Sequence, residues 1–370
     1  MNILAYLGAL LLQAWPMVLG LVLCYTVSQR NCQLLDNLYQ GAGRSAWVGF
    51  FWSMGCALLC ALLASALALA LGLRADVRLL QLLPWCMLVA TFLNLAEAAL
   101  PLSAAALLAL GVPAGMALGW CGVMQLAMAG LLALDGCNRG VQVTVEDPQG
   151  QNCGARWTAR IWPLPLLALL KEGDATGAVG ALAATALLAG YQDLQIFHNP
   201  RQDRLFRPGF CLLTGLALLG LSKLPQLGQI IGGVLVAALC VLWWGVRYWR
   251  TQRKAPWCAL PERGARVLQV SADSPLGRAG LASGDIIVFM NGGNVVTPQR
   301  VEWLLRSRPA QVDMEVLRQD ARVSLSAQDQ REGIGDEGLW LLPKQPDRTF
   351  VIPIWPMRLV PGAWKKARRF

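Results

Sequence analysis

SADSPLGRAGLASGDIIVFMNG, residues 271–292, is the stretch that decides the fold of the C-terminal part of the chain. It predicts a polar turn and a short helix, then a tight turn, an apolar strand and a second turn. Glycine suits such turns because it adopts positive φ without steric cost. The turn and cap signals are Ser274-Pro275, Ala279-Gly280-Leu281, Gly284-Asp285 and Asn291-Gly292. The pattern indicates a compact soluble fold in a chain that is otherwise mostly apolar.

The segments on either side of this stretch complete a mixed pattern of strands and helices. ARVLQV, residues 265–270, alternates in polarity as a strand does. Thr297 is suited to cap a helix whose first turn holds Pro298. The inner face of that helix would carry Val301, Leu304 and Leu305. Residues 311–327 predict two further strands joined by a turn, so the whole order indicates an α+β domain.

Residues 255–345 resemble a PDZ domain through the glycine-marked turns quoted above. The resemblance implies peptide binding by strand addition beside one strand and the long helix. It also implies a glycine-rich loop whose N–H groups hold a peptide carboxylate. The sequence departs from the usual order, because PWCALPE before Gly264 is short for that loop and a full strand. A better match, EGIGDEGLWLLP, follows the last strands at 332–343.

We therefore expect a circularly permuted domain whose peptide-binding strand comes from residues 338–342. The alternative is that residues 333–343 merely pack as an edge strand, and the sequence leaves both open. The residues that the resemblance implies for peptide binding are Gly338, Leu339, Trp340, Leu341 and Leu342 on the strand and Pro298, Val301, Glu302 and Leu305 on the helix.

Long apolar blocks dominate the chain before residue 250. Of all residues 55% are hydrophobic and 15% charged, compared with about 25% charged in an average soluble domain. Because a helix crosses a bilayer with about 20 apolar residues, we expect seven or eight spans, at 3–27, 46–73, 79–98, 101–118, 119–135, 161–190, 209–222 and 229–248. The fold class is therefore a polytopic α-helical membrane domain followed by a soluble α+β PDZ-like domain.

Some of these blocks leave alternatives open. Residues 101–135 suit two helices joined by a tight turn, but the sequence leaves the number of spans here open. The break KEGDATG, residues 171–177, either divides the block 161–190 into two pieces or interrupts one span, and the block 209–222 is short. The loop 135–160 contains VQVTVED and ARWTARIW, which alternate in polarity and predict a small hairpin or an amphipathic lid.

The side of the membrane on which the C-terminal domain lies is indicated by charge. Trp243, Trp244, Tyr248 and Trp249 are typical of an interfacial belt, and Arg247, Arg250, Arg253 and Lys254 accompany them. Positive charge beside a span marks the cytoplasmic side. We therefore expect a multi-pass plasma-membrane protein with a cytoplasmic C-terminal domain. The N-terminus is then cytoplasmic with eight spans and outside with seven.

Few residues suggest chemistry in the membrane part. Asn94 and Glu97 share a helix face, where the acid either meets the headgroups near a span end or serves as a proton or ion site. Cys137 and Cys153 share a polar loop and are either a disulfide or two thiols. The glycine rows Gly111, Gly115, Gly119 and Gly228, Gly232 suit close helix packing, although Pro113 disrupts the first row.

Catalytic machinery is not evident in the sequence. HExxH is absent, and the single histidine, His198, has no nucleophile motif near it. One histidine and no CxxC pair make a zinc site improbable. Lys171 and Lys223, the lysines near spans that a Ser-Lys dyad would need, resemble span-end charges. We expect no catalytic residues, no metal and no cofactor, and hence no enzyme.

The overall plan of several spans, an arginine-rich exit and one C-terminal PDZ domain resembles the MinJ family of bacterial division-site topological factors. The domains are then 1–250 in the membrane, 255–345 PDZ-like and 346–370 a basic tail. The resemblance implies a membrane adaptor in cell division and septum placement, with a DivIVA-like scaffold and MinCD-type proteins as partners and no nucleic acid. Lys365, Lys366, Arg368 and Arg369 in the tail suit an anionic membrane surface or a solvated tail. The alternative function is a transporter or protease-like protein whose PDZ domain regulates substrate access.

Overall fold

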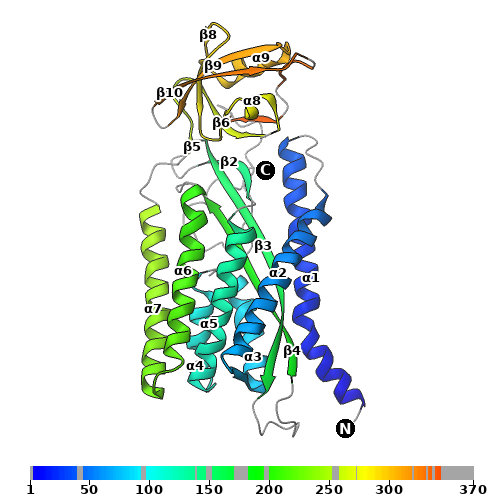
Figure 1. Cartoon of the computed structure of the whole chain (residues 1–370), viewed down its shortest axis with the longest axis vertical. Coiled ribbons are helices and arrows are strands. Elements are labelled where there is room, and N and C mark those ends of the chain that lie inside the picture. The colour runs from blue at the N-terminus through cyan, green and yellow to red at the C-terminus, as the bar shows by residue number, and fades with distance from the viewer. Residues whose placement is uncertain are drawn as a thin grey trace.

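The computed structural model describes the chain in two parts, a tall helical bundle and a β-rich C-terminal domain at one end of it (Figure 1). The described residues are 3–39, 45–92, 97–137, 140–146, 152–170, 182–195, 200–251, 258–271, 273–318, 321–330, 332–335 and 338–342. The N-terminal apolar helices followed by a C-terminal PDZ-like sheet confirm the expected fold class.

Seven α-helices are described in the bundle, and they are α1 (Ile3–Tyr39), α2 (Ala46–Ala70), α3 (Val77–Phe92), α4 (Ala99–Ala109), α5 (Ala114–Leu131), α6 (Pro200–Leu221) and α7 (Gln226–Thr251). A π-helix, Leu132–Gly136, continues α5. Among the described residues three helices are long and apolar enough to cross a membrane, at Ala46–Ala70, Ala114–Gly136 and Gln226–Val246. The chain is therefore a multi-pass membrane protein.

The expected helical span at 161–190 is wrong, because this block forms a β-hairpin inside the bundle. Strands β3 (Asn152–Leu170) and β4 (Leu182–Gln195) pair antiparallel from Arg156↔Gln195 to Leu169↔Leu182. Pro163 and Pro165 explain the difference, since each would remove a hydrogen bond from a helix. Helices pack on both sides of the hairpin, with Gly20 of α1 against Pro163.

The exposed edge of β3 is adapted to apolar surroundings. A strand edge in a membrane needs partners for its N–H and C=O groups. Pro163 and Pro165 have no N–H to satisfy. The N–H of Leu167 donates to Ser65 Oγ of α2 at 3.1 Å, and Asn31 Nδ2 of α1 donates to the Ala159 carbonyl at 3.1 Å. Side chains from neighbouring helices thus replace a further strand.

The blocks 79–98, 101–118 and 119–135 are divided differently from the expectation. Helices α3 and α4 have 16 and 11 residues, which is short of the roughly 20 that a span needs. Helix α4 ends before a turn at Gly111, whose φ is +80°. A single helix, α5, then runs from Ala114 and continues as the π-helix to Gly136. The predicted tight turn is confirmed, but it lies near residue 111 and not near residue 118.

Helix α1 begins at the end of the bundle that is distant from the C-terminal domain (Figure 1). The two ends of the described chain therefore lie on opposite sides of the bundle, as an odd number of crossings requires. Of the two alternatives from the sequence, this arrangement agrees with an N-terminus on the side opposite to the C-terminal domain.

The C-terminal domain follows the predicted element order. Its elements are β6 (Ala265–Val270), α8 (Pro275–Arg278), β7 (Ile286–Met290), β8 (Gly293–Asn294), α9 (Pro298–Arg306), β9 (Gln311–Arg318), β10 (Ala321–Gln328) and β11 (Leu339–Leu341). The strands form one sheet in the order β10-β9-β7-β6-β11, and β8 pairs with β7. Its buried core includes Val267, Leu276, Ile287, Val301 and Val316.

Short strands connect this domain to the bundle. β2 (Val141–Glu146) pairs with the first residues of β3, which confirms the predicted hairpin in the loop 135–160. β5 (Cys258–Ala259), just before the C-terminal domain, also pairs with β3, at Cys153 and Gly154. β1 (Arg74–Ala75) pairs with the far end of β3. The long strand β3 therefore pairs with four other described strands, β1, β2, β4 and β5.

Candidate functional site

The predicted peptide strand is an edge strand of the C-terminal sheet. β11 pairs antiparallel with β6 through Leu339↔Val270, Trp340↔Gln269 and Leu341↔Val267. The N–H of Ser271 donates to the Gly338 carbonyl at 2.7 Å. On the side away from β6, β11 ends the strand order of the described sheet. This is the position that strand addition requires.

The backbone of β11 alternates between the two sides of the strand. The Gly338 carbonyl and the Leu342 N–H both face β6, the latter donating to the Arg266 carbonyl at 2.9 Å. Because successive residues of a strand direct their hydrogen-bonding groups to opposite sides, Leu339 and Leu341 direct theirs away from β6. An added peptide strand would bond to these two residues.

The structure brings the predicted site residues of β11 and α9 to one core. Val301 and Leu305 of α9 are fully buried, and Leu339 packs in the same cluster with 7% of its surface exposed. Pro298 and Leu342 are also buried. Trp340 and Leu341 are partly buried, and Glu302 is exposed. Strand and helix therefore contribute to one core, although Val301 and Leu305 pack inward and are not accessible to a ligand.

Gly338 has a structural reason to be glycine. Its φ is +78°, in the region that favours glycine. A Cβ there would lie 2.9 Å from the Cβ of Ser271. A large side chain at Gly338 would thus disturb the pairing of β11 with β6, and substitution here does not isolate ligand binding from folding.

An ion pair that the sequence analysis missed fixes the loop before β7. Asp285 is buried and accepts two hydrogen bonds from Arg318 of β9, at 2.9 and 2.7 Å. Its Oδ2 also accepts from the Ala282 N–H at 2.9 Å. Hydrogen bonding to Asp285 raises the pKa of the Arg318 guanidinium. Asp285 was recognised as a turn residue, but its partner lies 33 positions later and has no local sequence signal.

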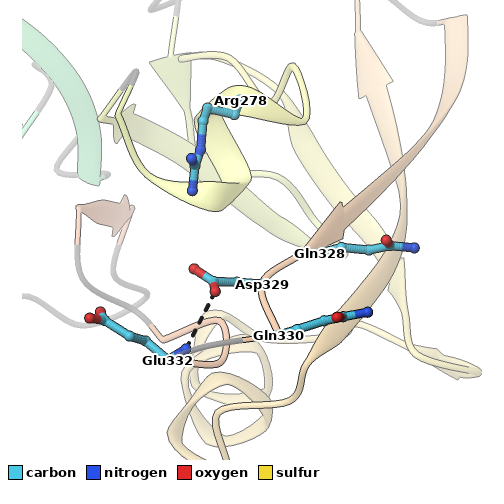
Figure 2. Close-up of a pocket in the computed structure, with 5 residues that line it drawn as sticks. All are labelled: Arg278, Gln328, Asp329, Gln330 and Glu332. Carbon is cyan, nitrogen blue, oxygen red and sulfur yellow. Dashed lines mark hydrogen bonds between the residues drawn. The ribbon is translucent and has the colours of Figure 1, made fainter.

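An open polar depression of about 570 Å³ lies at the end of β10. Figure 2 shows its lining, which is Arg278, Gln328, Asp329, Gln330 and Glu332. The Glu332 N–H donates to Asp329 Oδ1 at 3.4 Å. This lining contains none of the predicted groove residues, and its polar side chains do not suit an apolar peptide side chain.

Several predicted residues lie outside what the structure describes. They are Asn94, Lys171, His198, Arg253, Lys254 and the tail with Lys365, Lys366, Arg368 and Arg369. Cys137 and Cys153 are both buried, and no disulfide joins them, which contradicts the disulfide alternative. Of the predicted glycine rows, Gly115, Gly119 and Gly232 do lie at close contacts with other elements.

Solved structures that are similar to part of this chain include two PDZ domains. The PDZ domain of an SdrC-like protein from Listeria monocytogenes matches at 20% identity, covering 22% of this chain and 92% of that chain, with a TM-score of 0.19. The PDZ domain of an SdrC-like protein from Listeria innocua matches at 19% identity, covering 24% and 99%, with a TM-score of 0.19. No family model matches the chain. No curated protein matches it either.

The PDZ-like assignment therefore depends on the strand order and the pairing of β11. These give an open-edged strand that shares a buried core with helix α9.

Proposed function

We propose that this protein is a non-enzymatic membrane adaptor that captures a protein partner by strand addition to β11. The observation that carries the proposal is the edge position of β11, a strand that shares a buried core with α9. Leu339 and Leu341 direct two N–H and two C=O groups outward, which gives a partner strand a short ladder. The pairing of β5 with β3 holds this edge at the membrane domain.

The cellular role follows from the MinJ resemblance. We propose that the C-terminal domain faces the cytoplasm and contributes to placement of the bacterial division septum. A DivIVA-like scaffold and MinCD-type proteins are the partners that the resemblance implies. Arg247 and Arg250 in the last turns of α7, the last helix before this domain, support a cytoplasmic side.

The proposal is tested with Leu341→Pro in the full-length protein. Proline removes the outward N–H of Leu341, while the ladder bonds of Trp340 and Leu342 toward β6 remain. We expect loss of the partner proteins that co-purify with the wild type, while the domain stays folded with a somewhat lower melting temperature, because Leu341 only borders the core. Trp303→Ala is the matched control, because Trp303 is 61% exposed on the outer side of α9. Unchanged co-purification by Leu341→Pro would refute capture at β11.

The cellular part has a separate readout. A fluorescent fusion of the wild type should be enriched at septa or poles. An even distribution around the cell would contradict the division role and leave capture at β11 untouched.

A second candidate function, transport with a regulatory PDZ domain, is favoured by one feature. Glu97 and Arg207 form an ion pair inside the bundle, and ionisable residues within a membrane often mark ion or substrate pathways.

A further inference from the structure

Strand β10 forms the second open edge of the C-terminal sheet, opposite to β11. It pairs with β9 and ends the strand order of the described sheet. Natural edge strands are usually protected by proline, by lysine, by a bulge or by being short. β10, with the sequence ARVSLSAQ, contains neither proline nor lysine, and its eight residues pair with β9 without a register shift. The described residues therefore leave a long, regular edge that suits the addition of another strand.

Alternate residues of β10 direct their backbone groups away from β9. The Asp313 carbonyl of β9 accepts from the Asn291 N–H at 2.9 Å, so the hydrogen-bonding groups of Asp313 face the β7 side. Ser326 lies opposite Asp313 in the ladder, and such a pair exchanges no backbone hydrogen bonds. The N–H and C=O of Ser326 therefore point to the open side. Because this direction alternates along a strand, those of Ser324 and Arg322 point there as well.

The solvent-facing side of β9 and β10 carries an acid that has no cation beside it. Asp313 is exposed, and its Oδ1 accepts from Ser326 Oγ at 2.7 Å. Gln311 Nε2 donates to both carboxylate oxygens at 3.1 Å. Among the described residues no cation pairs with Asp313, whereas Arg322 Nη1 lies 3.9 Å from Glu315 Oε2. The face thus presents a carboxylate that a cation from outside the domain can approach.

We propose that β10 pairs antiparallel with β10 of a second copy of this chain, with Ser324 of both copies at the two-fold axis. In this register Arg322 of one copy lies opposite Ser326 of the other. The guanidinium then reaches Asp313 of the other copy, next to Ser326, and gives that carboxylate a counter-charge. The two-fold axis creates this contact twice, and the pairing closes at two copies because both use the same edge.

Backbone geometry and charge together select this register. A pair that exchanges two hydrogen bonds must match residues whose groups both point to the open side. Arg322 with Ser326 and Ser324 with Ser324 meet this condition. A shift of the axis to Leu325 would place Arg322 opposite Gln328, away from the acid. One strand pair is a small interface, but two copies that are confined to one membrane meet at a raised effective concentration.

Charge reversal in differently tagged copies tests the pairing in the full-length protein. Two copies are expressed in one membrane and solubilised in mild detergent at low salt, and one tag is used to recover the other copy. Arg322→Glu brings two acids together, and Asp313→Lys brings two cations together. Each variant expressed alone should therefore lower the recovery about tenfold relative to the wild type. Co-expression of Arg322→Glu with Asp313→Lys restores opposite charges at both contacts, so it should restore the recovery.

The controls match these changes in charge. Arg306→Glu at the end of α9 and Glu262→Lys before β6 reverse exposed charges on other elements, and they should leave the recovery unchanged. Restored recovery by the mixed pair also shows that both variants fold. Unchanged recovery in the single variants, or no restoration by the mixed pair, would overturn the proposal.

A cysteine at the axis gives a second measurement that does not depend on charge. Ser324→Cys places two thiols opposite each other, so a short thiol-specific cross-linker should join the copies in intact membranes. We expect this reaction to be about tenfold faster than for Ser307→Cys, whose side chain is exposed after α9. Equal rates would overturn the proposal, and so would a wild type whose copies do not recover each other, which would leave the edge to a strand of another protein. Leu341→Pro should change neither measurement, because the proposal is independent of partner capture at β11.

Discussion

Gly154 of β3 provides a direct test of how the C-terminal domain is attached to the bundle. A Cβ at Gly154 would lie 2.5 Å from Leu268 Cδ1 and 2.7 Å from Cys258 Sγ. Leu268 is 4% exposed and lies at the point in β6 where the pairing of β6 with β11 shifts register. Gly154→Ala therefore forces Leu268 away, and overpacking of this kind costs about 1–3 kcal/mol. We expect this cost to appear as weaker pairing between β5 and β3.

Hydrogen exchange measures that pairing. If β5 opens from β3 more easily by about 1–3 kcal/mol, the amides of Cys153 and Cys258 should exchange roughly 5–150 times faster. Leu268→Ala removes the atoms that clash, so the double variant should exchange no faster than Leu268→Ala alone. The two substitutions are then coupled by about 1–3 kcal/mol, as neighbours are.

A matched glycine controls for the loss of backbone freedom. Gly55 of α2 has no atom within 4 Å of its would-be Cβ, so Gly55→Ala should leave exchange at β5 unchanged. Unchanged exchange in Gly154→Ala, or additive effects in the double variant, would refute docking through Leu268 and Gly154.

Three further predictions concern stability and ionisation. Ile287 is fully buried and Ile286 is only partly buried. Ile287→Asp should therefore unfold the C-terminal domain, because burying the carboxylate costs several kcal/mol, and Ile286→Asp should cost less. Thermal unfolding of the two variants compares these costs. Ser65→Ala removes the acceptor of the Leu167 N–H and should cost about 1–3 kcal/mol, measured by the melting temperature in detergent. Hydrogen bonds from Ser326 and Gln311 lower the pKa of Asp313. The ionised Asp313 therefore stabilises the domain at pH values above the ordinary aspartate pKa, and this stabilisation is lost as the pH falls through the lowered pKa. Ser326→Ala should raise the pKa of Asp313 in an NMR titration.

The C-terminal domain could be predicted because its turns carry local signals. Ser274 caps α8 by accepting from the Gly277 N–H at 3.1 Å, and Gly280 and Gly284 have positive φ, as their place in the turns required. Thr297 does precede α9, but its side chain makes no cap hydrogen bond. Such local signals are lacking where contacts are long-range, as in the pairing of Asp285 with Arg318.

The membrane bundle was harder to predict because apolar composition does not distinguish a buried strand from a helix. The apolar composition of residues 161–170 is compatible with a helix and with a buried strand. Pro163 and Pro165 were the signal that favoured a strand. The pairing of Glu97 with Arg207 joins residues 110 positions apart, and no sequence period relates them. Hydropathy therefore indicated the long apolar helices but not the internal hairpin.

The length of β3 connects the two parts of the molecule physically. Its 19 residues extend about 60 Å at 3.3 Å per residue, from the pairing with β5 at Cys153 to the pairing with β1 at Leu170. Hairpin pairing with β4 along most of this length keeps β3 extended. Since α7 ends at Thr251 and β5 begins at Cys258, the C-terminal domain is tied to the bundle by a short connection and by a strand. A partner strand added to β11 would therefore be held at a fixed height and orientation above the membrane. The chain of contacts is direct, because β11 pairs with β6 and Leu268 of β6 lies against Gly154 of β3.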